Sequence, residues 1–109
     1  MRVISGSLKG KKILEPKDIK TRPLKDLTKE SIFNIILHSN KFKIDLKKSN
    51  ILDLFSGVGS FGLECLSRGA KNVIFIENNE FFYITMYIVA ECFSIKVSTY
   101  IVIIIVYYC

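Results

Sequence analysis

Three glycines, Gly57, Gly59 and Gly62, follow the G-x-G-x-x-G spacing directly after an apolar run that contains one acid, Asp53. A helical pattern comes next, so the expected order is strand, tight turn and helix, with a backbone-lined cavity at the carboxyl end of the strand. Glycine suits such a turn because a side chain would block a ligand's approach to the backbone or forbid the required dihedral angles. The spacing therefore predicts a site for a nucleotide-like cofactor.

Two acids narrow the choice of cofactor. Glu77 ends the next apolar run, 20 residues after Gly57, where a carboxylate can accept hydrogen bonds from ribose hydroxyls. Asp53 would repel the pyrophosphate of a dinucleotide, because both are negatively charged, whereas it suits the ammonium and sulfonium groups of S-adenosylmethionine. The pattern therefore favours a methyltransferase. The alternatives are an NAD-dependent oxidoreductase and a βαβ unit whose glycines serve packing alone.

The elements that position these residues can be predicted from the apolar pattern. Apolar runs at 51–55 and 73–76 predict two strands, the second of them buried, and a short helix between them is expected to stop at Gly69. Because strand, helix and strand follow one another so closely, the strands are expected to be parallel. An earlier helix is predicted from Asp26 or Thr28 to about His38, opened by a capping residue.

The positive charge lies in the first half of the chain. Residues 1–50 hold 13 Lys and Arg against 5 Asp and Glu, whereas residues 51–109 hold 3 against 5. A basic segment joined to a near-neutral cofactor unit suggests a polyanionic partner, nucleic acid first, although a solvated lysine-rich surface is the alternative. Residues 1–15 predict a small β-hairpin or two short strands with exposed lysines. Residues 16–25 predict an extended connector, in which Arg22 is the best candidate for an RNA contact.

The cysteines indicate the cellular compartment. Cys65, Cys92 and Cys109 show no C-x-x-C pairing, and His38 is the single histidine. A zinc site is therefore not expected, and a reduced cytoplasmic protein fits best. The N-terminus has too few apolar residues for a signal peptide.

Several stretches of the chain resemble one known family. The residues D-L-F-S-G-V-G-S-F-G-L-E at 53–64 and L-S-R-G-A at 66–70 are similar to D-L-F-A-G-S-G-x-L-G-L-E-A-L-S-R-G-A of the RsmD family. R-V-I-S-G at 2–6, G-K-K at 10–12 and R-P at 22–23 are similar to the start of the same family. The resemblance covers about residues 1–80. Members of this family methylate N2 of a guanine in 16S ribosomal RNA.

This resemblance implies an α/β protein with an incomplete Rossmann-like, S-adenosylmethionine-dependent methyltransferase domain over residues 26–109. A basic N-terminal extension, residues 1–25, would form a small β-hairpin and connector that bind RNA. The implied partner is 16S ribosomal RNA or the assembling small ribosomal subunit, and the complete protein would be a monomer. S-adenosylmethionine would lie with its methionine part near Asp53 and the glycines and its ribose at Glu77. The full set of cofactor-binding candidates is Asp53, Phe55, Gly57, Gly59, Gly62 and Glu77, and the RNA-binding candidates are Arg2, Lys11, Lys12 and Arg22.

The chain departs from the family in two places. Where the family has R-P-T followed by D-R-V-R-E, the chain has Leu24 after R-P and then D-L-T-K-E at 26–30, so positions in an expected substrate-facing segment differ. The (Asp/Asn)-Pro-Pro-(Phe/Tyr/Trp) motif expected of amino-methyltransferases is absent, because the only prolines are Pro16 and Pro23. We therefore assign no catalytic residue and expect the 109 residues alone to be inactive. The alternative function is that of a non-catalytic RNA-binding remnant.

Residues 81–109 are atypical, with Glu91 and Lys96 as their only charged residues. One interpretation is a helix over about 80–93 followed by a buried strand, which the β-branched residues favour. A second is a membrane anchor, although the final apolar run of about 13 residues is shorter than the ~20 that a spanning helix requires. The third, which we favour, is truncated or out-of-frame coding.

Overall fold

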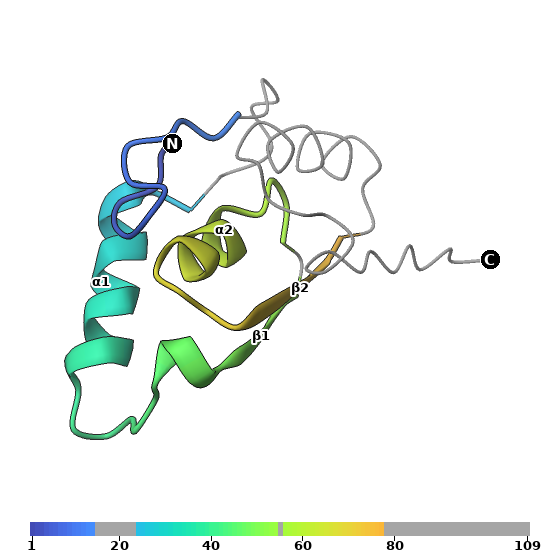
Figure 1. Cartoon of the computed structure of the whole chain (residues 1–109). Coiled ribbons are helices and arrows are strands. Elements are labelled where there is room, and N and C mark those ends of the chain that lie inside the picture. The colour runs from blue at the N-terminus through green and yellow to red at the C-terminus, as the bar shows by residue number, and fades with distance from the viewer. Residues whose placement is uncertain (15–23, 55, 78–109) are drawn as a thin grey trace.

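The computed structural model describes residues 1–14, 24–54 and 56–77 (Figure 1). Its elements follow the order α1 (Asp26–His38), a 3-10 helix η1 (Leu46–Lys48), β1 (Asn50–Leu54), α2 (Ser60–Ser67) and β2 (Asn72–Ile76). The strand, helix and strand predicted around the glycines are therefore confirmed, together with the α/β class. The predictions for Arg22, Phe55 and residues 81–109 fall outside the described residues.

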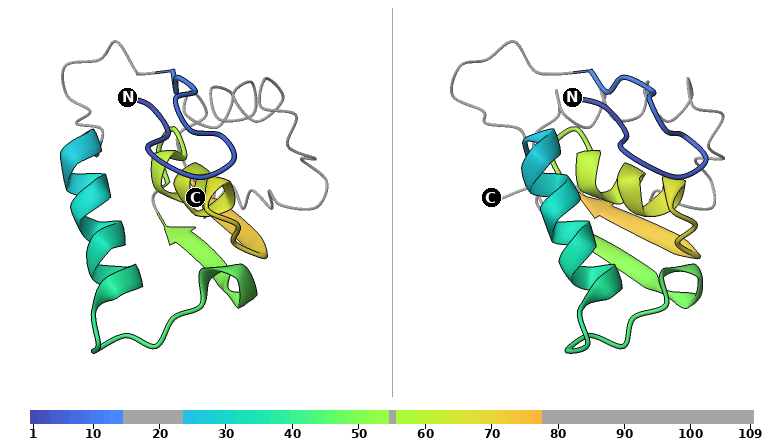
Figure 2. Two further views of the ribbon diagram at one scale, coloured as in Figure 1. Left: turned by 60° about the vertical axis from the view of Figure 1, so that its left-hand side comes forward. Right: turned by 90° about the vertical axis from the view of Figure 1, so that its left-hand side faces the viewer.

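The two strands form a parallel pair, as predicted, with Asn50 opposite Asn72 at the start of the register. Successive side chains point to opposite faces of the sheet. α2 packs on one face (Figure 2), where Val73 and Phe75 are fully buried. On the opposite face Leu52 is 55% exposed. The second strand was predicted to be buried. Its side chains alternate between the two faces, so it is buried only on the face that α2 covers.

Glycines lie just outside both ends of the helix α2 (Ser60–Ser67). Gly59, which precedes its first residue, has φ +79°, and its carbonyl accepts the N–H of Leu63 at 2.8 Å. At the other end Gly69 has φ +99° and donates its N–H to the carbonyl of Leu66 at 3.0 Å. Left-handed glycine is the usual way to satisfy the last carbonyls of a helix. The predicted stop at Gly69 is therefore confirmed.

The helix α1 has the predicted bounds but lacks the predicted side-chain cap. Lys25 is the residue before its first turn, and no side chain caps the helix there. Asp26 is already helical, and its carboxylate instead accepts the N–H of Arg2 at 3.3 Å. The prediction was wrong because a remote backbone amide, invisible in the local sequence, binds the acid. Among the described residues, the helices are all too short or too polar to span a bilayer.

Residues 1–14, the N-terminal arm, fold back on themselves across α2, on the side away from the sheet (Figure 2). Arg2 and Lys12 form an antiparallel bridge, and the N–H of Val3 donates to the carbonyl of Lys11 at 2.9 Å. Val3 and Ile13 are buried in the core. The arm is therefore the predicted hairpin in outline, but its ladder is limited to one bridge because turns occupy its middle.

Candidate cofactor site

The turn between β1 and α2 has the backbone that its glycines predict. Gly57 has φ +56° and Gly59 φ +79°, a region that residues with a Cβ rarely adopt. A Cβ built on Gly57 would meet no atom within 4 Å, so the space beside this residue is open. The N–H of Ser56 donates to the carbonyl of Ile76 at 3.0 Å, which fixes the start of the turn against the end of β2.

The hydroxyl of Ser56 is the polar atom at this turn that lacks a partner. In the described part of the chain its Oγ is buried and makes no hydrogen bond. Buried polar groups are nearly always hydrogen-bonded in folded proteins, and an exception at a turn beside open space indicates a group that a ligand or water satisfies. The turn therefore fits a polar ligand.

Glu77 lies at the same turn, although it follows the other strand. Its carboxylate Oε2 accepts the N–H of Gly57 at 2.7 Å, and the residue is 8% exposed. Parallel neighbouring strands end at the same edge of a sheet, which brings the residue after β2 beside the turn after β1. The structure thus brings together the acid and the glycine that the sequence placed in one site.

Asp53 faces the first turn of α2 from within β1. Its carboxylate Oδ2 accepts the N–H of Gly62 at 3.0 Å. Burial raises the pKa of Asp53 to about 6, the hydrogen bond from Gly62 opposes this rise, and the negative charge of Glu77 adds to it. The two carboxylates therefore act on each other across one small region. A cationic ligand group there would relieve that repulsion.

Gly62 has a packing role besides its place in the motif. A Cβ at this position would lie 2.2 Å from Cε1 of Phe75 and 2.9 Å from Cγ1 of Val73. Atoms cannot approach so closely, so α2 lies this near to β2 only because residue 62 has no side chain. Gly57 differs from Gly62, because its positive φ angle rather than a close contact calls for glycine.

Three of the four RNA-binding candidates lie on the N-terminal arm. Arg2 and Lys12 are bridge partners, and they and Lys11 are exposed. The Arg2 side chain is 67% exposed, and its Nε lies 3.8 Å from Oδ2 of Asp26. The arm therefore presents adjacent cations on its surface, while Arg22 lies outside the described residues.

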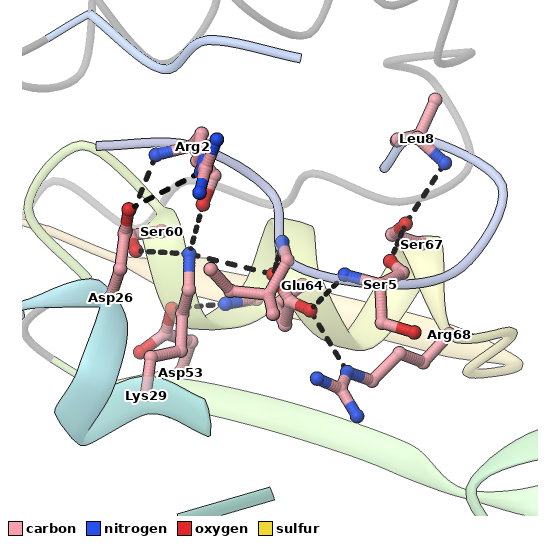
Figure 3. Close-up of polar contacts among 12 residues, drawn as sticks. Arg2, Ser5, Leu8, Asp26, Lys29, Asp53, Ser60, Glu64, Ser67 and Arg68 are labelled. Atoms are coloured by element: carbon pink, nitrogen blue, oxygen red, sulfur yellow. Dashed lines mark hydrogen bonds and ion pairs between the residues drawn. The ribbon is translucent and has the colours of Figure 1, made fainter. Parts of the chain in front are cut away.

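The sequence reasoning missed a buried polar cluster between α1, α2 and the arm (Figure 3). Lys29 and Glu64 are both fully buried, with Nζ and Oε2 3.4 Å apart, and Nε of Arg68 lies 2.9 Å from Oε1 of Glu64. The guanidinium of Arg68 also lies 4.4 Å from the ring centre of Phe33, which stacks on Phe61. Within the described residues, no group of three or more His, Cys, Asp or Glu side chains could hold a metal ion.

Lys29 corrects the expectation that segment 26–30 faces the substrate throughout. It is fully buried because it precedes Phe33 by four residues, which puts both on the helix face that packs inward. The same spacing separates Glu64 from Arg68. These i, i+4 pairs could be seen in the sequence, but only the fold shows that the two helices face each other there.

The chain is similar to one protein family and to several known proteins. The family model described as Conserved hypothetical protein 95 matches residues 1–96. A Bacillus subtilis protein named provisionally as an rRNA methyltransferase is 43% identical over 79 residues, which are 72% of this chain and 40% of that protein. Ribosomal RNA small subunit methyltransferase D of Haemophilus influenzae is 38% identical over 77 residues, 71% of this chain and 37% of that protein.

A solved structure supports the fold. The structure of an Escherichia coli protein that is provisionally named a methyltransferase superimposes on this chain with a TM-score of 0.76. The two chains are 23% identical, and the match covers 96% of this chain and 51% of that one. The described elements are thus part of a Rossmann-like methyltransferase fold, as predicted. The chain spans about two fifths of the length of the curated relatives it matches. With the family model matched over most of its length, the chain belongs to the Conserved hypothetical protein 95 family, the RsmD family that its sequence resembles.

Proposed function

We propose that the turn at residues 56–59 binds S-adenosylmethionine and that the protein methylates N2 of a guanine in 16S ribosomal RNA. The observation that carries the cofactor proposal is that Glu77 binds the amide of Gly57 in the turn, while Asp53 binds the amide of Gly62 in the first turn of the helix that follows. Two carboxylates at this turn disfavour a pyrophosphate and favour a ligand with cationic groups. The names of the relatives support the reaction class and the ribosomal RNA substrate.

Each residue of the turn has a distinct part in this proposal. Asp53 would attract the ammonium and sulfonium of the methionine part, and Glu77 would accept hydrogen bonds from the ribose hydroxyls. The open space beside Gly57 admits the ligand, and the unpartnered Ser56 hydroxyl offers it one more hydrogen bond. Phe55, which lies outside the described residues, stays a candidate. The bound cofactor would supply an electrophilic methyl group on sulfur.

The N-terminal arm would contact the RNA. Arg2, Lys11 and Lys12 are exposed on one short segment, and with Arg22 they would bind phosphates, which attract lysine and arginine regardless of base sequence. The partner is 16S ribosomal RNA or the assembling small subunit, which the protein would meet in the cytoplasm.

Calorimetric titration tests the cofactor proposal directly. Residues 1–109 are titrated with S-adenosylmethionine and, separately, with NAD. We expect heat of binding with S-adenosylmethionine and none with NAD at the same concentrations. Binding of NAD in preference to S-adenosylmethionine would establish the oxidoreductase alternative. Binding of neither ligand, by a chain that circular dichroism shows to be folded, would leave the packing role of the glycines as the correct interpretation.

The RNA proposal needs a separate experiment. Retention of 16S ribosomal RNA on filters is measured at several salt concentrations, because phosphate contacts make affinity fall with a clear slope in log salt. Retention at low salt with such a slope supports the proposal. An absence of retention at the lowest salt concentration would exclude the arm as an RNA-binding segment.

A further inference from the structure

The buried ion pair between Lys29 and Glu64 connects the N-terminal arm to the helix that follows the cofactor turn. Both side chains are fully buried, and their charged atoms lie 3.4 Å apart. Removing two charges from water is unfavourable, and only good geometry with further hydrogen bonds offsets this cost. The further bonds in this cluster therefore indicate what the pair holds in place.

The Lys29 ammonium has two neutral partners in different parts of the chain. Its Nζ donates to the carbonyl of Arg2 at 2.7 Å and to Oγ of Ser60 at 3.3 Å. Arg2 belongs to the arm and carries an exposed guanidinium. Ser60 is the first residue of α2 and directly follows Gly59 of the cofactor turn. The ammonium of Lys29 thus contacts both the arm and the first residue after the cofactor turn.

The Glu64 carboxylate binds the backbone of the next residues of the arm. Its Oε2 accepts the N–H of Ile4 at 2.9 Å, and its Oε1 accepts the N–H of Ser5 at 3.0 Å. One turn further along α2, the hydroxyl of Ser67 accepts the N–H of Leu8 at 2.9 Å. Figure 3 shows these contacts in a row along α2. The arm is therefore attached to this helix through its backbone, while its basic side chains stay exposed.

We propose that Lys29 is a positioning residue that fixes the arm, and with it Arg2 and Lys12, relative to the cofactor turn. A ligand in the turn then stabilises the attachment of the arm, because Lys29 contacts Ser60, which directly follows the turn, and the carbonyl of Arg2 in the arm. The RNA-facing cations are thus held more firmly in place when the methyl donor is bound. This proposal rests on the proposed function, since it takes the turn to bind S-adenosylmethionine and the arm to bind RNA.

Amide hydrogen exchange measured by NMR tests this linkage at the amides of Ile4 and Ser5. In the wild-type chain, saturating S-adenosylmethionine should slow exchange at both amides about fivefold or more, because ligand binding reduces local opening. In Lys29→Met the same amides should exchange about tenfold faster without ligand, and the cofactor should no longer slow them. Lys29→Arg should restore the cofactor effect, because an arginine keeps a positive charge with N–H donors and is the residue that the family resemblance gives at this position.

Ser60→Ala is a second variant that keeps every charge in the cluster. It removes the contact between Lys29 and α2 but leaves the bonds from Glu64 to the arm. Exchange at Ile4 and Ser5 should stay at the wild-type rate without ligand, and the slowing by S-adenosylmethionine should fall by about half or more. This variant keeps the proposal testable even if Lys29→Met does not fold.

Two results would overturn the proposal. One is a wild-type chain that binds S-adenosylmethionine by calorimetry while exchange at Ile4 and Ser5 stays unchanged. The other is full cofactor-dependent slowing in Lys29→Met or Ser60→Ala. A wild-type chain that binds no S-adenosylmethionine would instead refute the proposed function and the linkage with it. The ligand-free comparison of Lys29→Met with the wild type would still decide whether Lys29 attaches the arm.

Discussion

The carboxylate of Glu77, which follows β2, accepts the amide N–H of Gly57, in the turn after β1, at 2.7 Å. This bond joins two residues that stand 20 positions apart and leaves the acid 8% exposed. Its consequence is that one carboxylate has two tasks in the proposed site. It holds the turn in shape, and it would accept hydrogen bonds from the ribose.

Two substitutions of Glu77 separate these tasks. Glu77→Gln keeps one oxygen for Gly57, so unfolding free energy in urea should change by less than about 1 kcal/mol. The ribose would then meet an amide group instead of a charged acceptor, and S-adenosylmethionine affinity should fall about tenfold in calorimetry, since hydrogen bonds to charged acceptors are roughly twice as strong. Glu77→Ala should weaken binding further and also lower stability by about 1–3 kcal/mol. Wild-type affinity in Glu77→Gln would contradict the ribose role.

The raised pKa of Asp53 predicts a dependence of stability on pH. Its pKa is about 6 in the folded chain against 3.8 for an ordinary aspartate. Between these values the folded chain binds more protons than the unfolded chain, so the contribution of Asp53 to stability falls as pH rises through this window. Asp53→Asn removes this dependence and keeps an acceptor for Gly62. In urea unfolding, the free energy of unfolding of the variant relative to the wild type should increase by about 2 kcal/mol from the acidic to the neutral end of this pH window.

The same residue predicts the opposite trend in cofactor binding. Only the ionised carboxylate attracts the cationic methionine part, so the affinity of the wild-type chain for S-adenosylmethionine should rise with pH as Asp53 loses its proton near its pKa of about 6. Asp53→Asn should bind about tenfold more weakly at neutral pH, a loss of roughly 1.4 kcal/mol. Its affinity should also be less dependent on pH. An identical pH profile of binding in the two proteins would rule out Asp53 as the charged contact.

Two alanine substitutions at glycines form a matched pair. Gly57 (φ +56°) and Gly10 (φ +83°) both have left-handed backbone, and a Cβ on either would meet no atom within 4 Å. Gly57→Ala and Gly10→Ala should therefore each lose about 1–2 kcal/mol of stability through backbone strain. Only Gly57→Ala should also lose S-adenosylmethionine affinity, because its methyl group enters the space proposed for the ligand. Equal affinities in the two variants would place the ligand elsewhere.

Salt dependence measures the contribution of the arm to RNA binding. Arg2→Ala and Lys12→Ala should each weaken filter retention of 16S ribosomal RNA and reduce the slope of log affinity against log salt by about one. Lys43→Ala serves as the control, because Lys43 is exposed but lies in the loop after α1. If Lys43→Ala reduces the slope as much as the arm variants do, the RNA contact is a diffuse property of the lysine-rich half.

Local patterns predicted much of this fold. The glycine spacing and the two apolar runs gave the order of β1, α2 and β2, because turn chemistry and periodicity are encoded in neighbouring residues. Gly69 marked the end of α2 for the same reason. The missing cap of α1 could not be predicted, because Asp26 binds a backbone amide 24 residues away in the sequence.

The candidate site was predictable to a similar extent. Asp53 and Glu77 could be assigned to one site because parallel strands bring their ends together. Gly62 donates its N–H to Asp53, and its lack of a side chain makes room for Phe75. These two roles could not be predicted, because they depend on how close α2 lies to the sheet. The burial of Lys29 could not be predicted, because it depends on how α1 packs against α2 and no local pattern of residues encodes that packing.

The bonds from Glu64 to Ile4 and Ser5 span 60 and 59 residues, and this separation has a consequence for the order of folding. Closing so long a loop loses chain entropy before any contact compensates for it, so contacts of this range form late. The arm is synthesised first, yet its partners on α2 leave the ribosome only after some sixty further residues. The N–H groups of Ile4 and Ser5 therefore have no acceptor on α2 until that helix is complete, although α1 offers Asp26 and Lys29 to Arg2 earlier.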